Sequence, residues 1–316
     1  MMSSLVKDPM NIRLGMIGMT EGNGHPYSWS AIYNNYNKER MTAECPFPGI
    51  PAYLNKVPSD EIGIPGAKVT HVYCDQKSDA EHVSALSLVP NVVDRPEEML
   101  GEVDAVIIGT DIGSQHVDRA RFFIENHVPL LIDKPLCDNR ADLEQFIAWD
   151  KAGAKFLSAS SMRFGKEFKP YHRNYHELGE MRYITMTMPK KWETYGIHAL
   201  ETIYPIVGPG FVSVENIDPQ PGKNLVHLVH SCGADVLIAN RKDIFWSRLM
   251  LVGNAGEAEI KFQDSYNSFR DLQCSFIEYL RTGVRPIPFE ETVELMKLVI
   301  AGIESGKEGG KRIAID

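Results

Sequence analysis

The sequence predicts an α/β protein, with an N-terminal doubly wound parallel sheet and a C-terminal α+β part that has an open, mostly antiparallel sheet. In the N-terminal part, short apolar runs alternate with helix-like stretches, which is typical of parallel strands joined by helices. After about residue 155, several strand-like runs follow one another without helices between them, which indicates antiparallel pairing. The 316 residues are enough for about two domains of ~150 residues each.

The N-terminal elements are read from apolar runs, helical periodicity and end signals. We predict strands over residues 12–18, 68–74, 104–109 and 129–133, and helices over 26–37, 114–126 and from the cap at Asp138-Asn139 to Gly153. Residues 38–66 are rich in proline and glycine and show no regular pattern. We interpret them as an insertion that forms either a lid or an oligomer contact.

The C-terminal elements follow the same criteria. We predict strands over residues 211–217, 225–231, 234–239, 246–252 and 257–262, and helices over 265–281 and 289–305. The domain boundary is placed after residue 137, so that residues 1–137 and 138–316 form the two domains. The last helix is a candidate for returning to the first domain.

Composition excludes several classes of function. The net charge is −9 with no block of like charges, which argues against nucleic acid or an anionic membrane as the main partner. No apolar run approaches the ~20 residues of a membrane span, and the first residues lack an apolar signal core, so we expect a cytoplasmic protein. The five cysteines lack metal-ligand spacing, so we expect reduced thiols and no metal.

The tripeptide Asp133-Lys134-Pro135 is the most informative short stretch. It ends the apolar run 130–132, and Pro135 keeps Lys134 out of helical geometry. Ligands bind at the carboxyl ends of strands in an open α/β sheet, where an ammonium can contact a substrate hydroxyl or a cofactor. The tripeptide alone fits an exposed charged turn equally well.

A glycine-containing turn follows the first predicted strand. Gly18 begins it, but Thr20 stands where a dinucleotide-binding turn has its second glycine, and Gly22 lies nearby. Asp75 ends the second predicted strand, where a carboxylate accepts hydrogen bonds from a ribose and repels a 2′-phosphate. This favours NAD over NADP, although Asp75 lies 57 residues after Gly18 instead of ~20, and a structural turn remains an alternative.

Several motifs in order give the chain a family resemblance. They are the stretch 104–110 with His116–Ala120, the tripeptide Asp133-Lys134-Pro135, the segment Gly196–His198 and the stretch 288–296. In this order they resemble the Gfo/Idh/MocA oxidoreductases along nearly the whole chain. The resemblance implies a Rossmann domain that binds NAD(H) or NADP(H), and an activity on a carbinol of a sugar or cyclitol.

The resemblance also implies residue roles. Lys134 would contact cofactor and substrate, and His198 would transfer the proton. The cofactor cleft would be lined by Thr110, His116, Asp133 and Pro135. The chain departs from the family at Thr194, where the family has an acid four residues before the histidine.

The residues around His198 raise further candidates. Glu193 and Glu201 are acids that could orient the imidazole, and Thr194 and Tyr195 could join a proton relay. A strand through this segment would point Glu193 and Thr194 to opposite faces, so Glu193 would not replace position 194. For His198 itself, a satisfied core histidine or a residue at the start of a helix remains the alternative.

Three residues are candidates for substrate binding. Lys191 and Trp192 could line a polyol pocket, with Trp192 stacking on a sugar face; the alternative is a charged strand end with an anchoring aromatic residue. His25 lies in a polar and aromatic cluster beside the glycine turn, and packing of the insertion is its alternative.

The leading hypothesis is an NAD-dependent oxidoreductase acting on a sugar, sugar derivative or cyclitol. One alternative is an enzyme that uses NAD transiently for elimination or glycoside cleavage without net redox change. The other is a non-catalytic sugar or nucleotide sensor. By family analogy, an open sheet face predicts a homodimer or homotetramer.

Overall fold

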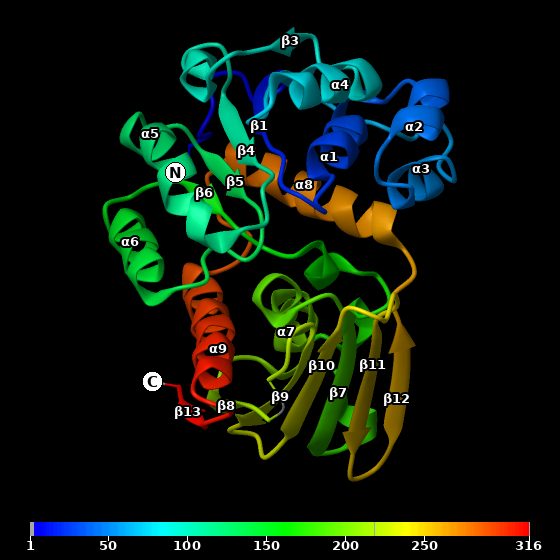
Figure 1. Cartoon of the computed structure of the whole chain (residues 1–316), viewed down its shortest axis with the longest axis vertical. Helices are drawn as coiled ribbons and strands as arrows, with labels where there is room; N and C mark the ends of the chain where they lie inside the picture. Colours follow the sequence, from blue (N-terminus) through cyan, green and yellow to red (C-terminus); the bar gives the residue numbers. More distant parts are fainter. Residues whose placement is uncertain (1–2, 218, 316) are drawn as a thin grey trace. The chain divides into compact units, whose positions relative to one another are not determined.

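The computed structural model describes residues 3–217 and 219–315 (Figure 1). The chain divides into two compact units. Unit 1 contains the residues up to Asp133 together with Gln145–Ser158 and Phe269–Ile287, and unit 2 contains Lys134–Glu144, Ala159–Ser268 and the residues from Pro288. The predicted boundary after residue 137 stays a prediction.

Unit 1 is built on a six-stranded sheet in which every pair of neighbours is parallel. In order across the sheet, the strands are β3 (Asn91–Val92), β2 (Ala67–Tyr73), β1 (Ile12–Ile17), β4 (Ala105–Ile108), β5 (Leu130–Ile132) and β6 (Phe156–Leu157). This is the strand order of dinucleotide-binding sheets, and it confirms the predicted parallel fold. Every residue of β4 and β5 is buried, as expected for strands covered on both faces.

The helices of unit 1 lie against this sheet. α1 (His25–Asn34) packs on β1 and β2, α4 (Lys77–Ser87) on β2 and β3, and α5 (His116–Glu125) on β4 and β5 (Figure 1). The residues of α6 (Arg140–Lys151) and α8 (Ser265–Thr282) are divided between the two units. Single turns of 3₁₀ helix occur at Pro96–Met99, Gly113–Gln115, Ser161–Phe164, Lys169–Tyr171 and His176–Leu178.

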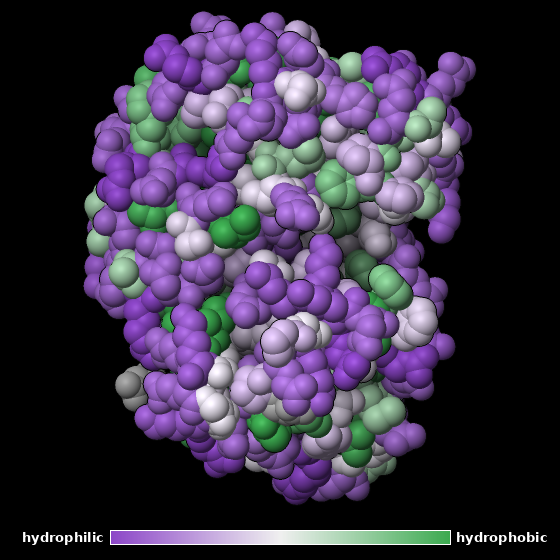
Figure 2. All heavy atoms as spheres, viewed as in Figure 1, coloured by the Kyte–Doolittle hydropathy of each residue, from purple (hydrophilic) through white to green (hydrophobic). Residues whose placement is uncertain are grey.

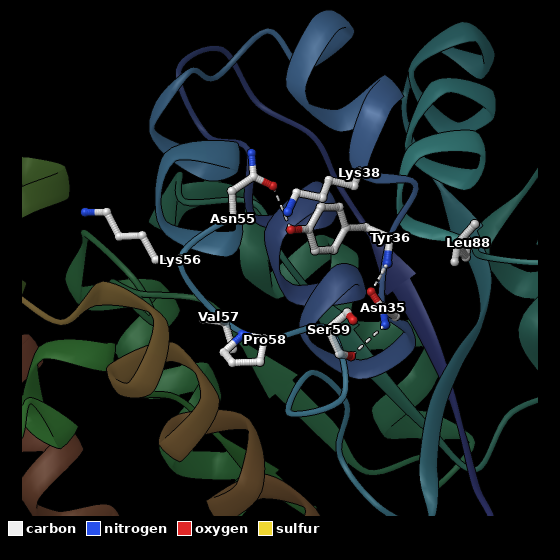
Figure 3. A pocket seen from close by; sticks show the side chains of 9 residues that line it. All are labelled: Asn35, Tyr36, Lys38, Asn55, Lys56, Val57, Pro58, Ser59 and Leu88. Carbon is white, nitrogen blue, oxygen red and sulfur yellow. Dashed lines mark hydrogen bonds between the residues drawn. The ribbon is translucent and has the colours of Figure 1, made fainter.

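The segment 38–66 is more regular than its composition indicates. It contains α2 (Lys38–Glu44) and α3 (Gly49–Leu54), which correct the expectation of irregular structure. The side chain of Asn37 caps α2 by accepting from the backbone N–H of Arg40, and Arg40 pairs with Glu44 one turn later. Residues of this segment line a pocket of about 520 Å³. In it the Tyr36 hydroxyl donates to the Asn55 side chain at 2.8 Å (Figure 3).

Unit 2 is built on a seven-stranded mixed sheet. In order across it, the strands are β12 (Glu257–Lys261), β11 (Arg248–Gly253), β7 (Met181–Pro189), β10 (Asp235–Arg241), β9 (Lys223–His230), β8 (Phe211–Asn216) and β13 (Ile313–Ala314). β7 and β10 pair in parallel and the other neighbours are antiparallel. This confirms the predicted, mostly antiparallel sheet.

A long helix begins where the sequence suggested a strand. α7 (Trp192–Val207) follows β7 directly, so the strand geometry expected for Glu193 and Thr194 is wrong. α7 packs on β7 and β10, and α9 (Phe289–Lys307) packs on α7 and β8 (Figure 1). On the opposite face of the sheet, β7 and β10 present half-exposed side chains at alternate positions.

The surface is mainly polar, and hydrophobic residues appear singly or in small groups on the face shown in Figure 2. No helix in the described part of the chain is long and apolar enough to cross a membrane. All five cysteines are free thiols, as expected. Burial raises the pKa of Cys45, so its thiolate is disfavoured.

Candidate functional site

The glycine turn of unit 1 lies at the carboxyl end of β1, where the strand order reverses between β1 and β4. A Cβ on Gly18 would lie 2.1 Å from the Pro26 side chain, so glycine is needed for close packing of α1 on the strand end. Gly22 adopts φ of 77°, a left-handed conformation that glycine tolerates. The Thr20 hydroxyl donates to Asp111 at 2.8 Å and ties the turn to the segment that follows β4.

Thr110 and His116 shape the adjacent loop. The His116 ring is buried, and its Nε2 donates to the Thr110 carbonyl at 2.8 Å, so His116 fixes the loop conformation. The Thr110 hydroxyl is buried and has no hydrogen-bond partner among the described residues. Buried polar atoms are normally satisfied, so this oxygen is a candidate contact for a ligand. Strand order, turn packing and this hydroxyl together fit a dinucleotide.

Asp75 follows β2, as the ribose-binding residue should, but it also has a protein partner. Arg119 of α5 donates to both Asp75 oxygens, at 3.0 and 2.6 Å, and also contacts Gln115. Half of the Asp75 side chain is exposed (49%), so it remains accessible to a ligand. The Arg119 guanidinium compensates the charge of the Asp75 carboxylate. Sequence reasoning did not predict this ion pair because the two residues are 44 positions apart.

Asp133 and His25 form a pair in unit 1. His25 Nδ1 lies 2.6 Å from Asp133 Oδ2, and Asn23 Nδ2 donates to the same oxygen at 3.1 Å. Asp133 is almost fully buried. Sequence reasoning selected His25 and Asp133 separately, but did not predict their contact or the role of Asn23.

Lys134 opens unit 2 and is also buried, with 3% exposure. Its ammonium lies 5.0 Å from the centre of the Tyr195 ring, and the ammonium of Lys190 lies 4.5 Å from the same centre. Such cation–π contacts stabilise a charge whose hydration is reduced. Pro135 follows across a cis peptide bond. Lys134 and Tyr195 are therefore neighbours, as a shared active site requires.

His198 lies on α7, one turn after Thr194. Its Nδ1 is 2.6 Å from the Ser160 hydroxyl, and its ring meets the Tyr195 ring edge-on at 4.7 Å. The backbone N–H of Met162 also donates to the Ser160 hydroxyl at 3.1 Å. A serine therefore faces the imidazole nitrogen, a contact that sequence reasoning did not predict.

Glu193 and Glu201, the two acids considered for orienting the His198 imidazole, lie in different environments. Glu201 pairs with Arg163 and accepts from the Ser160 backbone N–H at 3.2 Å. Burial raises the pKa of Glu201, and Arg163 opposes that shift. Glu193 lies in the first turn of α7, with one carboxylate oxygen buried and without a hydrogen-bond partner in the described chain. Ser160 contacts both Glu201, through its backbone N–H, and His198, through its hydroxyl.

Trp192 is part of the core of unit 2. Its ring is 1% exposed, and its Nε1 donates to the Val299 carbonyl at 2.9 Å. A Cβ on Gly196 or Gly302 would lie 2.4 or 2.3 Å from the indole, so both glycines make room for the ring. This arrangement favours the anchoring alternative over stacking on a sugar. Lys191 borders a separate groove of about 390 Å³ that Lys242 and Lys307 also line.

Replacing Trp192 therefore tests these two alternatives. We expect Trp192→Ala to lower the free energy of unfolding by about 3–5 kcal/mol, because it removes a large buried ring and leaves a cavity. Urea unfolding measures this, with Met10→Ala as the control, since Met10 is 74% exposed. Unchanged stability combined with a raised KM for substrate would instead support a sugar-stacking role.

Comparison with known proteins places part of the chain in a family. Residues 12–159 match the GFO_IDH_MocA model, described as an oxidoreductase family with an NAD-binding Rossmann fold. Comparison with curated protein sequences gave no match. In the described residues, no group of three or more histidine, cysteine or acidic side chains is placed to hold a metal.

Solved structures share the fold over nearly the whole chain. A myo-inositol dehydrogenase from Lactobacillus casei, in complex with NAD(H) and myo-inositol, matches with a TM-score of 0.75 and 12% identity over 97% of each chain. A scyllo-inositol dehydrogenase from the same organism matches with 0.74 and 13%, over 98% of this chain and 99% of the other. A myo-inositol dehydrogenase from Corynebacterium glutamicum matches with 0.70 and 16%, over 97% and 99%.

Proposed function

We propose that this chain, whose residues 12–159 match the model of the Gfo/Idh/MocA oxidoreductase family, is an NAD-dependent dehydrogenase or reductase for a carbinol of a sugar, sugar derivative or cyclitol. The observation that carries the proposal is the buried ammonium of Lys134 on the Tyr195 ring, directly after β5 of a sheet with the dinucleotide-binding strand order. The substrate class is supported by inositol dehydrogenases with the same fold.

The proposed roles follow from chemistry at the named atoms. When bound, the nicotinamide supplies the hydride acceptor or donor. Lys134 would donate a hydrogen bond to the substrate oxygen and stabilise the negative charge that develops there. An imidazole would exchange the hydroxyl proton, and the family resemblance names His198 for this role. Thr110, Asp75 and the turn from Gly18 to Gly22 would bind the dinucleotide.

Two measurements test the proposal. Titration with NADH, followed by nicotinamide fluorescence, should show saturable binding, and a panel of polyols with NAD should yield NADH for at least one inositol or sugar. Product formation without net NADH would favour the non-redox lyase or glycosidase. Binding of a sugar without any binding of NADH would favour the sensor.

Arg119 makes a prediction about cofactor preference. With Arg119 beside it, Asp75 repels a 2′-phosphate less than a lone carboxylate would. We expect NADH to bind more tightly than NADPH. Because Arg119→Leu removes one partly exposed positive charge, it should raise the ratio of the Kd for NADPH to the Kd for NADH by about 3- to 10-fold. Arg121→Leu on the same helix is the control. An unchanged ratio in the Arg119 variant would contradict the prediction.

We also propose a homodimer or homotetramer formed through the half-exposed face of the unit 2 sheet. Tyr183 lies on this sheet with 38% exposure, and Phe245 and Trp246 follow β10 with 80% and 70% exposure. Exposed aromatic residues of this size are characteristic of interaction surfaces. Light scattering on the purified protein and on Trp246→Ser tests the assembly.

A further inference from the structure

The His25–Asp133 pair has the geometry of an oriented base. An aspartate carboxylate accepts hydrogen bonds, so the proton between Asp133 Oδ2 and His25 Nδ1, 2.6 Å apart, belongs to the imidazole. The neutral ring then carries its lone pair on Nε2. Fixing the tautomer of an imidazole in this way is what the aspartate does in hydrolase triads.

The pair is held from several sides. Asn23 uses its amide nitrogen to bind Asp133 and the Gly109 carbonyl, each at 3.1 Å, and its amide oxygen to accept from the His25 backbone N–H at 2.8 Å. The Trp29 ring stacks on the imidazole at 4.3 Å with 13° between the planes, and Phe269 meets it edge-on at 5.4 Å. The imidazole is therefore fixed before any ligand binds.

The position of the pair is that of a ligand site. Asp133 follows β5, Gly109 follows β4 and His25 begins α1, so all three lie at the carboxyl edge of the unit 1 sheet. The His25 side chain is 16% exposed, while its partner Asp133 is 1% exposed. Lys134 is the next residue along the chain after Asp133.

The two imidazoles differ in what faces their Nδ1. His25 faces a carboxylate, and His198 faces the Ser160 hydroxyl at 2.6 Å. A carboxylate stabilises the imidazolium that forms on proton transfer more than a hydroxyl does. Thr194 has taken the place of the acid that the family resemblance leads one to expect beside His198, and Asp133 supplies an acid beside His25 instead.

We propose that His25, oriented by Asp133, is the catalytic base and acid of this chain; the proposal rests on the redox function proposed above. In the oxidation direction, the substrate O–H bond breaks and its proton binds His25 Nε2. The C–H bond of the carbinol carbon breaks, and its hydrogen transfers as a hydride to the nicotinamide. The electron pair of the former O–H bond forms the second bond of the carbonyl. In reduction, His25 returns the proton to the oxygen.

The structural premise is tested in the protein without added substrate. Nitrogen-15 NMR of the histidine rings should show one neutral ring protonated on Nδ1, and its signal should vanish in His25→Gln. In Asp133→Asn, the remaining His25 signal should change to the Nε2-protonated form. A wild-type ring already protonated on Nε2 would overturn the proposal.

The catalytic premise is tested by kinetics. We expect His25→Gln to lower kcat by about 10²–10⁴-fold and to remove one limb of the pH profile of kcat, while NADH affinity stays within a few-fold. Among the contacts of His25 described above, Asp133 is the charged group, since Asn23, Trp29 and Phe269 do not titrate. His127→Asn is the control, because His127 is exposed and φ of 58° suits asparagine.

His198→Gln completes the comparison. We expect it to raise KM or lower kcat by a smaller factor and to leave the pH profile in place. If His25→Gln lowers only the melting temperature and His198→Gln removes the pH dependence, His25 is a packing residue and this inference is wrong, while the proposed function stands. If the wild-type protein neither binds NADH nor turns over any polyol, the proposed function fails first.

Discussion

Replacing Lys134 with alanine should lower kcat by about 10²–10⁴-fold while the protein remains folded. The ammonium is 3% exposed and lies on the Tyr195 ring, so it acts where few water molecules compete for its charge. In the role proposed for Lys134, its interaction with the substrate oxygen strengthens as that oxygen becomes negative in the transition state. The loss should therefore fall on kcat more than on KM.

The experiment needs a control for the loss of a positive charge. Lys190 provides it, because its ammonium lies 4.5 Å from the centre of the same ring. Lys190→Asn suits its φ of 60° and should cost much less than Lys134→Ala. NADH titration and a thermal melt of each variant separate catalysis from binding and folding. Equal losses of kcat in both variants would show that any positive charge beside the Tyr195 ring has this effect. Full activity in Lys134→Ala would show that Lys134 takes no part in the mechanism.

Most of the longer strands and the two C-terminal amphipathic helices were predictable because their patterns are local, whereas β7 (Met181–Pro189) was not predicted. The predicted helix of residues 265–281 corresponds to α8 (Ser265–Thr282), and the predicted helix of 289–305 to α9 (Phe289–Lys307). α7 was missed because it is buried on most sides, so it has no alternation of apolar and polar faces. Gly196 and Pro205 inside it also resemble breaks in a helix.

Sequence reasoning could select single candidate residues of the site, but not the partners that they contact. Lys134 could be found because strand end, charge and proline are adjacent in sequence. The partners that set its chemistry come from distant positions: Ser160 lies 38 residues from His198, and Asn23 lies 110 residues from Asp133. Such contacts depend on the packing of the strands, which residue spacing does not reveal. The sequence therefore suggested candidate residues, but it did not predict the hydrogen bonds among them.

The second large effect concerns the stability of unit 2. Arg163 pairs through its Nε with Glu201 and through Nη1 with Glu291 at 2.8 Å, and the side chains of Arg163 and Glu201 are only 11% and 3% exposed. Arg163→Met should lower the free energy of unfolding by about 3–5 kcal/mol, because it leaves the Glu201 carboxylate buried without its cation. Arg182→Met, which breaks an exposed pair with Glu180, should cost about 0–1 kcal/mol.

The loss in Arg163→Met should depend on pH in a definite direction. Burial already raises the pKa of Glu201, and removal of Arg163 takes away an opposing effect, so the pKa should rise further. A carboxyl group whose pKa is higher in the folded state stabilises that state below its unfolded pKa, and this contribution is lost as the pH rises through the folded pKa. The deficit of the variant relative to wild type should therefore be larger at pH 8 than at pH 5, as measured by urea unfolding at both values.

A second substitution identifies the cause. Glu201→Gln in the Arg163→Met background removes the buried charge while keeping the shape of the side chain, so it should recover part of the lost stability at pH 8 and remove most of the difference between pH 5 and pH 8. Two outcomes would contradict this explanation: additive losses of stability in the double variant, or a deficit in Arg163→Met that is equal at both pH values. Either would show that the contribution of Arg163 to stability comes from packing of its aliphatic stem and not from the charge of Glu201.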